Sequence, residues 1–247
     1  MQRFWLNYVH LSAIVILEFR QWLGMLVTLT VFLNLGMMFS FSFIAGTRDP
    51  ELGIYIVPGA AIMTLVTLGV SMVANDLAQQ RRSGAIQYYA ALPISKAAYV
   101  LAMVTANGIA ALPGMIITVV TGAWLYQLPL VFNPLVLVVI PLSAISLAGL
   151  GAVIGLGIKN WRVVGLVAQS VMFFIIFFAP VMIPAQRLPG VLQVTGWFLP
   201  PTYAARAFRA SLSPGLSAET VMDVAILAVF AFGSLALVSR FLEWRLE

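Results

Sequence analysis

The segment PLVLVVIPLSAISLAGLGAVIGLG, residues 134–157, is 24 residues long and contains no charged residue. It decides the fold class of this chain. A helix needs about 20 consecutive, mostly apolar residues to cross the hydrocarbon core of a bilayer. The segment also lacks the apolar and polar alternation of a membrane β-strand. It therefore predicts a transmembrane helix.

The rest of the chain repeats this composition. The predicted spans are residues 23–45, 54–74, 99–125, 134–157, 163–183 and 221–239. The chain is 62% hydrophobic and 9% charged, whereas about a quarter of the residues of a soluble protein are charged. Because the spans occupy more than half of the 247 residues, we expect an all-α integral membrane protein with a single domain over residues 1–247.

The distribution of positive charge predicts the orientation, because cytoplasmic loops carry an excess of Lys and Arg. With the N-terminus in the cytoplasm, nine of the 13 basic residues lie on the cytoplasmic side and four lie outside. Orientation in a membrane therefore explains the net charge of +5 better than binding to nucleic acid does. Both termini are then predicted to be cytoplasmic.

A polar tract, NDLAQQRRSGAIQYYAALPISKAA at residues 75–98, separates the second and third predicted spans. Ser83 is a candidate helix N-cap, Ile86 and Tyr89 share helical spacing, and Pro93 disfavours helix in the residue before it. The tract therefore predicts a short amphipathic helix on the cytoplasmic side. An interfacial anchor whose arginines meet lipid phosphates explains the same pattern.

The stretch before the first span, QRFWLNYVHLSAIVILEFRQW at residues 2–22, mixes aromatic and basic residues. This composition is typical of a helix lying in the membrane interface. A simple membrane anchor has the same composition, so both interpretations remain open.

Residues 184–219, between the fifth and sixth spans, are divided by prolines into two pieces near 189–198 and 202–212. Each piece is too short to cross a bilayer, yet the stretch from Val191 to Leu199 is too apolar for a free loop. We therefore expect a re-entrant segment of two short helices in the outer leaflet, because broken backbone at membrane depth must be covered by protein or face a water-filled cavity.

The start of the last span carries a predicted cap at Ser217, followed by Glu219 and Asp223. Negative charge in the first turns of a helix interacts favourably with its dipole. We therefore assign a dipole role to both acids.

The order of these elements, together with two motifs, resembles the permease subunit of ABC-2 type ABC transporters, in the exporter branch. The tract RRSGAIQYYAALPIS, residues 81–95, is similar to the family's charged residue and glycine before a stretch ending in Pro-Ile-Ser. The segment FLPPTYAARAFRA, residues 198–210, is similar to its proline-rich stretch followed by a helix with a basic residue. The resemblance covers essentially the whole chain.

The resemblance implies a coupling helix in the 75–98 tract, seated on a separate ATP-binding subunit present in two copies. That subunit would bind ATP and magnesium, and this chain would bind no cofactor or metal. Residues implied at the contact are Arg81, Arg82, Ser83, Gly84, Ile86, Gln87, Tyr88, Tyr89, Leu92 and Pro93, with Glu18 and Arg20 from the N-terminal stretch. A second permease copy, identical or closely related, and membrane lipid are the other implied partners, in a bacterial or archaeal plasma membrane.

Family analogy also implies a pathway along the first and fifth spans. Candidate pathway residues are Phe39, Phe41, Met63, Phe173 and Phe177, and candidate outer-gate residues are Trp197, Pro200, Pro201, Tyr203 and Arg206. An uncharged lining suits a hydrophobic or amphiphilic cargo such as a drug, an antibiotic or a lipid-like molecule. Export of a polysaccharide or glycolipid is the alternative within the same family.

The lysines of the chain, Lys96 and Lys159, follow Ser95 and Ile158 rather than the glycine that a P-loop requires, so we expect no ATPase activity of that kind. A channel or an ion-coupled carrier is the rival class. Carriers of this kind usually place ionisable residues inside their spans, and the first five predicted spans contain none. A membrane protein with a purely structural role is a third possibility.

The fourth span contains the pattern Gly151-x-x-x-Gly155, which allows two helices to approach closely. The pattern fits either a contact between two subunits or packing inside one. The sequence leaves both interpretations open.

Overall fold

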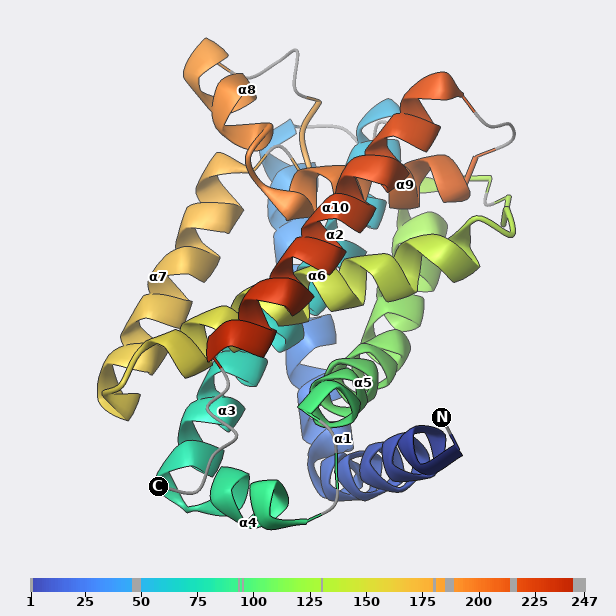
Figure 1. The fold of residues 1–247 in the computed structure, drawn as a ribbon. Coiled ribbons are helices and arrows are strands. Elements are labelled where there is room, and N and C mark those ends of the chain that lie inside the picture. Colours follow the sequence, from blue (N-terminus) through green and yellow to red (C-terminus); the bar gives the residue numbers. More distant parts are fainter. Residues whose placement is uncertain are drawn as a thin grey trace.

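The computed structural model describes residues 2–45, 50–92, 94, 96–129, 131–179, 181–184, 189–213 and 217–241. Its regular elements in these ranges are all helices (Figure 1). Six helical segments of the described chain are long and apolar enough to cross a membrane. The predicted all-α integral membrane fold is therefore confirmed.

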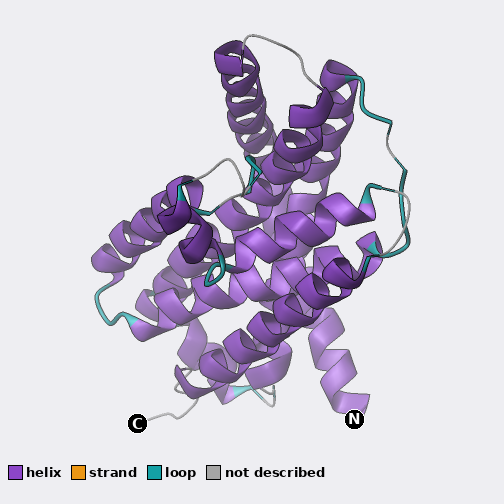
Figure 2. Ribbon diagram, turned by 90° about the horizontal axis from the view of Figure 1, so that it is seen from above, coloured by secondary structure: helices purple, strands orange, loops and turns teal. Residues whose placement is uncertain are grey.

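The helices in chain order are α1 (Gln2–Ala45), α2 (Pro50–Val66), the π-helix η1 (Thr67–Met72), α3 (Val73–Arg82), α4 (Ala85–Ala91), α5 (Lys96–Tyr126), α6 (Val136–Gly157), α7 (Trp161–Phe178), α8 (Gly190–Gly196), α9 (Pro200–Ser211) and α10 (Ala218–Phe241). Helix α4 lies at one end of the bundle, and α8 and α9 lie at the other (Figure 1). We call these the α4 end and the α9 end. Figure 2 shows the same helices from above, joined by loops.

The second span is the centre of the bundle. Helices α2, η1 and α3 continue one another from Glu51 to Arg82, and 83% of the most apolar part of this span is buried. The sequence predicted that the span ends near residue 74, so the helix continues into the tract expected to be a loop. The reason is that Leu77 and Ala78 give these polar turns a buried apolar face.

Helix α6 crosses the central span at η1 and α3, and its glycines make this crossing possible. A methyl group at Gly151 would overlap the carbonyl oxygen of Gly69 in η1. A methyl group at Gly155 would lie 2.6 Å from the carbonyl oxygen of Ala74. The glycine pattern of the fourth span therefore serves packing within one subunit.

Helix α1 includes both the predicted interfacial helix and the first span. Its first part lies across the α4 end, and the helix then bends to run along the bundle (Figure 1). The predicted N-terminal helix and the predicted first span are therefore two parts of one continuous helix. Inside the bundle, the Asn34 side-chain amide donates to Thr64 Oγ1 at 2.8 Å and to Thr118 Oγ1 at 3.2 Å, which ties α1 to α2 and α5.

The fifth span ends earlier than predicted. Helix α7 stops at Phe178, and Val181 and Met182 follow as buried, non-helical residues. Gly59 of α2 makes room for them, because a methyl group there would lie 2.6 Å from the Val181 carbonyl oxygen. The two short helices predicted next are present as α8 and α9, and the Ser217 hydroxyl accepts from the Thr220 N–H at 3.2 Å as the predicted cap of α10.

Candidate functional site

The turn between α3 and α4 depends on Gly84. Its φ of 78° lies in the left-handed region, which glycine adopts without the steric cost of a Cβ. The Ser83 N–H donates to the Gln79 carbonyl at 2.9 Å, and the Ser83 hydroxyl donates to the Gln80 carbonyl at 3.2 Å. Ser83 therefore ends α3, and its predicted role as the N-cap of α4 is wrong.

The inner face of α4 packs against the bundle. Ile86 is buried in a cluster that also contains Leu11 of α1, Leu77 of α3 and Tyr99 of α5. The Tyr89 ring lies on the same face, with its centroid 5.4 Å from that of Tyr99. This face therefore places α4 in one apolar cluster with α1, α3 and α5, and residues of α6 and α10 also belong to it. We call it the coupling cluster.

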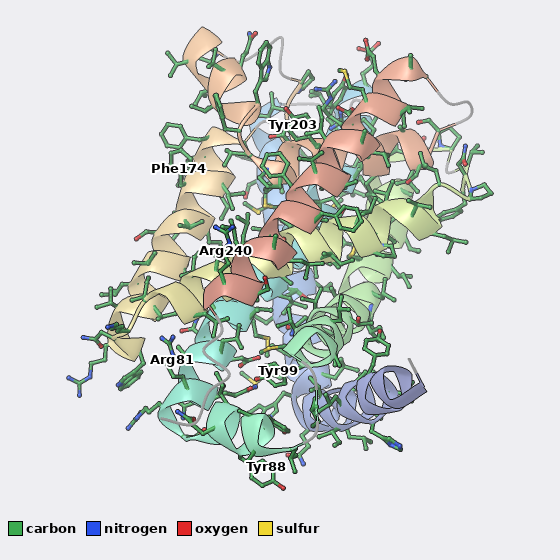
Figure 3. All side chains as sticks on the ribbon, in the orientation of Figure 1. Arg81, Tyr88, Tyr99, Phe174, Tyr203 and Arg240 are labelled. Carbon is green, nitrogen blue, oxygen red and sulfur yellow. The ribbon has the colours of Figure 1, made fainter. Side chains whose placement is uncertain are left out.

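The outer face of α4 is exposed. Gln87 and Tyr88 lie on this face, and Tyr88 is 65% exposed. Figure 3 shows the Tyr88 side chain pointing away from the bundle at the α4 end. Leu92 ends the helix in an extended conformation, and Pro93 lies outside the described residues. An aromatic side chain this exposed at the end of a bundle is available to a partner protein.

The first part of α1 joins the same coupling cluster. Leu11 is buried in it, and the Tyr8 hydroxyl donates to Thr105 Oγ1 of α5 at 2.9 Å. A force on α1 or on α4 would therefore reach the same group of side chains. The side chains of Glu18 and Arg20, also predicted at the contact, lie outside the described part of the molecule.

Arg81 holds two helices together. Its guanidinium donates to the carbonyl oxygens of Leu156 at 2.6 Å and Ile158 at 3.1 Å, where α6 ends. Carbonyls in the last turn of a helix lack intrahelical donors, and a cation there also interacts favourably with the helix dipole. Arg81 therefore caps α6 inside the subunit, a role that the sequence did not reveal.

Arg82 lies on the surface beside the loop between α6 and α7. Its guanidinium carbon stands 4.4 Å from the centre of the Trp161 ring, and that of Arg162 stands 5.6 Å from the same centre. We call these three residues the arginine–tryptophan stack. Trp161 was not predicted as a site residue, because it is far from Arg82 in the sequence and the two side chains meet only in the folded chain.

The α9 end is organised differently. Helix α9 begins with Pro200 and Pro201, whose fixed φ suits the first turn of a helix, and both are buried. The Tyr203 hydroxyl donates to the carbonyl of Trp197 at 2.8 Å, which joins α9 to the segment after α8. The Trp197 ring itself is 69% exposed. These predicted outer-gate residues therefore lie close together.

Arg206 forms an ion pair with Asp223 across α9 and α10. Its Nε lies 3.1 Å from Asp223 Oδ2, and the Asp223 side chain is almost fully buried. The role assigned to Asp223 from the sequence, an interaction with the helix dipole, is therefore incomplete. The ion pair links residues that are far apart in sequence, and no local pattern indicated it.

Arg209, one turn after Arg206, compensates for a proline. Pro58 lacks an N–H, so the carbonyl of Ile54, four residues earlier in α2, loses its normal helix donor. Arg209 Nε donates to this carbonyl at 3.2 Å, and its guanidinium carbon lies 4.0 Å from the centre of the Tyr55 ring. Burial lowers the pKa of the Arg209 guanidinium to about 10, so it stays charged at neutral pH.

The predicted pathway residues do not meet within one chain. Phe39 of α1 and Phe173 and Phe177 of α7 are exposed, whereas Met63 is buried in the core of α2. The Phe41 side chain lies outside the described residues. Figure 3 shows Phe174, a neighbour of Phe173, projecting outward from α7. A pathway involving these side chains would need surfaces from more than one chain.

A family model described as ABC-2 type transporter matches residues 9–213. No curated protein matches the chain in sequence. The match includes the first part of α1, the α4 end and all of α9. Among the described residues, no group of three or more His, Cys, Asp or Glu side chains could hold a metal ion.

Proposed function

Because the chain belongs to the ABC-2 type transporter family, we propose that it is the membrane-spanning subunit of an ATP-driven exporter. The observation that carries this proposal is helix α4, whose inner face is buried in the coupling cluster while Tyr88 is exposed on its outer face. A short helix with these two faces suits the transmission of movement from a partner into the bundle.

The partner in this proposal is a separate ATP-binding subunit, which supplies ATP and magnesium and is present in two copies. Permeases of this family generally pair with such a subunit. The α4 end then faces the cytoplasm, and the exposed cations Arg82, Lys159 and Arg162 at this end support that orientation. The membrane is proposed to be the plasma membrane of a bacterium or archaeon.

Movement would enter through the coupling cluster. Ile86 of α4, Leu77 of α3 and Met103 of α5 belong to this cluster, so displacement of α4 acts on both helices. Helix α3 continues directly into η1, and π-helical turns occur frequently at functional sites. We propose that ATP-driven movement of α4 is passed along the central span.

A second permease copy would complete the pathway. The most apolar parts of α1 and α7 are only 17% buried, so both spans leave apolar side chains uncovered within one chain. Phe39, Phe173 and Phe177 lie on these spans. Their uncharged character supports a hydrophobic or amphiphilic substrate, and spans of this kind face either lipid or another chain.

The first experiment is purification from native membranes in mild detergent, with identification of the proteins that accompany the chain. We expect a stoichiometric partner that carries a P-loop, and ATP hydrolysis only when this partner is present. A chain that runs as a self-contained oligomer with no such partner would shift the assignment to a channel or ion-coupled carrier.

The role of α4 is tested by Tyr88→Glu in the complex, with Tyr88→Phe as the matched control. We expect Tyr88→Glu to weaken binding of the partner about tenfold or more, because aromatic anchors at interfaces typically contribute about 2 kcal/mol. Tyr88→Phe keeps the ring and should bind normally. Normal binding and transport by Tyr88→Glu would remove α4 from the contact.

A further inference from the structure

Helix α9 carries two arginines with unequal neighbours. Arg206 is neutralised by its ion pair with Asp223. Arg209 lies one turn later, and no carboxylate among the described residues is within ion-pair distance of it. Arg209 stays charged at neutral pH, so its guanidinium is a cation without a carboxylate in direct contact among the described residues.

The contacts of Arg209 use only part of its guanidinium. Nε donates to the Ile54 carbonyl at 3.2 Å, and Nη2 reaches the Val181 carbonyl at 3.4 Å. Its remaining N–H groups have no acceptor among the described residues. A guanidinium presents its donors in a planar fork that matches the oxygens of phosphate and carboxylate groups.

Arg209 lines a cavity of about 200 Å³. The cavity lining includes the apolar residues Val57, Pro58, Leu128 and Leu212 and the polar residues Arg209 and Ser213. Apolar side chains therefore make up most of the wall, and the cation stands among them. A small hydrophilic anion would satisfy the cation but would leave the apolar wall without a partner.

We propose that this cavity binds the anionic head of an amphiphile, a phosphate or carboxylate group attached to an apolar chain. The head accepts hydrogen bonds from Arg209, and the first part of the chain contacts the apolar wall. Charge-assisted hydrogen bonds of this kind are among the strongest in proteins. This site goes beyond the proposed transport function, and its test requires neither the partner nor transport.

The test measures binding of dodecyl phosphate to the purified full chain in a neutral detergent by native mass spectrometry. We expect one molecule per chain, bound more tightly than dodecyltrimethylammonium. Arg209→Gln should weaken binding about tenfold or more, because it removes the hydrogen bonds between the charged guanidinium and the anionic head. Arg240→Gln is the matched control, because it removes an exposed arginine from α10 and should bind like the wild type.

A second variant tests the site independently, in case Arg209→Gln does not fold. Leu128→Trp fills the cavity while Arg209 is retained, and it should also weaken binding of dodecyl phosphate. Wild-type affinity in both variants, or equal binding of the cationic and anionic probes, would overturn the proposal. So would displacement of dodecyl phosphate by inorganic phosphate alone at similar concentrations, because the apolar wall would then contribute nothing.

The source of the amphiphile is identified in lipid nanodiscs. If the wild-type chain retains phosphatidylglycerol that Arg209→Gln loses, the ligand is a membrane lipid. If dodecyl phosphate binds but phosphatidylglycerol is not retained, the site takes single-chain anions. Both results support an anionic amphiphile, and a chain that binds neither dodecyl phosphate nor phosphatidylglycerol contradicts it.

Discussion

The α4 end and the α9 end each hold a short helix with arginines beside it, but they neutralise these charges differently. At the α4 end, Arg82 lies on the surface against the Trp161 ring at 4.4 Å. At the α9 end, Arg206 pairs with the buried Asp223, and Arg209 donates to backbone carbonyls. The α4 end therefore uses Arg81 inside the subunit but presents Arg82 to solvent, whereas both described arginines of α9 have partners inside the subunit.

The two helices also differ in how they are supported. Helix α4 spans Ala85–Ala91, and Ile86 is its one residue classed as buried. Helix α9 spans Pro200–Ser211 and is buried along most of its length against α2, α6 and α10. A helix as short as α4 is marginal on its own, so α4 depends on the coupling cluster or on a partner.

This contrast supports the proposal that the ATP-binding subunit binds at the α4 end. The residues of α9 already have partners within the subunit, so a second protein would have to break those contacts. The outer face of α4 presents an aromatic ring and polar groups, and a partner could contact them without breaking contacts inside the subunit. The central span, continuous from Glu51 to Arg82, connects the two ends.

The largest expected effect comes from breaking that connection. Gly151→Leu places a side chain where a methyl group already overlaps the Gly69 carbonyl, so α6 must separate from η1. We expect a loss of about 3 kcal/mol or more in the free energy of unfolding, because overpacking on rigid backbone is not relieved by side-chain movement. Thermal unfolding in detergent measures this loss.

Gly157→Leu is the matched control, because it lies on the same helix and has no atom within 4 Å of an added methyl group. We expect it to unfold at nearly the wild-type temperature. If both variants are equally stable, α6 does not pack closely on the central span, and the two ends are not rigidly joined.

The spans could be predicted from the sequence because apolar length alone identifies them. The two short helices before α10 were also predicted from the prolines, although α9 begins at Pro200 rather than near residue 202. The continuous helix through residues 75–82 was missed, because its burial comes from a single face formed by Leu77 and Ala78. The π-helix η1 has no recognisable local pattern in the sequence.

The site was predicted less completely than the fold. Tyr88 was assigned to the partner contact only through the family resemblance, and the structure leaves its ring 65% exposed. The acceptors of Arg81, the ring beneath Arg82 and the pair between Arg206 and Asp223 all depend on tertiary contacts. A single sequence gives the charge of such residues but not their partners.

Asp223→Asn tests whether the α9 end is held by its ion pair. The change leaves Arg206 without its counter-ion, and we expect a loss of about 2 kcal/mol in the free energy of unfolding. The loss is smaller than for a fully buried pair, because the Arg206 side chain is 38% exposed. Glu219→Gln, one turn earlier on α10 and exposed, should cost only about 0.3 kcal/mol through the helix dipole. Unchanged stability of Asp223→Asn would mean that the apolar packing of α9 holds this end.

Arg82→Gln makes a matched change of charge at the α4 end and should have the smallest effect on stability. An exposed cation–π contact contributes about 0.5 kcal/mol, and the Trp161 ring is 42% exposed. A double-mutant cycle with Trp161→Leu measures this contact directly, because only the interaction energy survives the subtraction. If the surface serves a partner, Arg82→Gln should weaken binding of the ATP-binding subunit far more than it weakens the fold. A stability loss as large as that of Asp223→Asn, with binding unchanged, would make the arginine–tryptophan stack a structural support, and the two ends would then use their arginines alike.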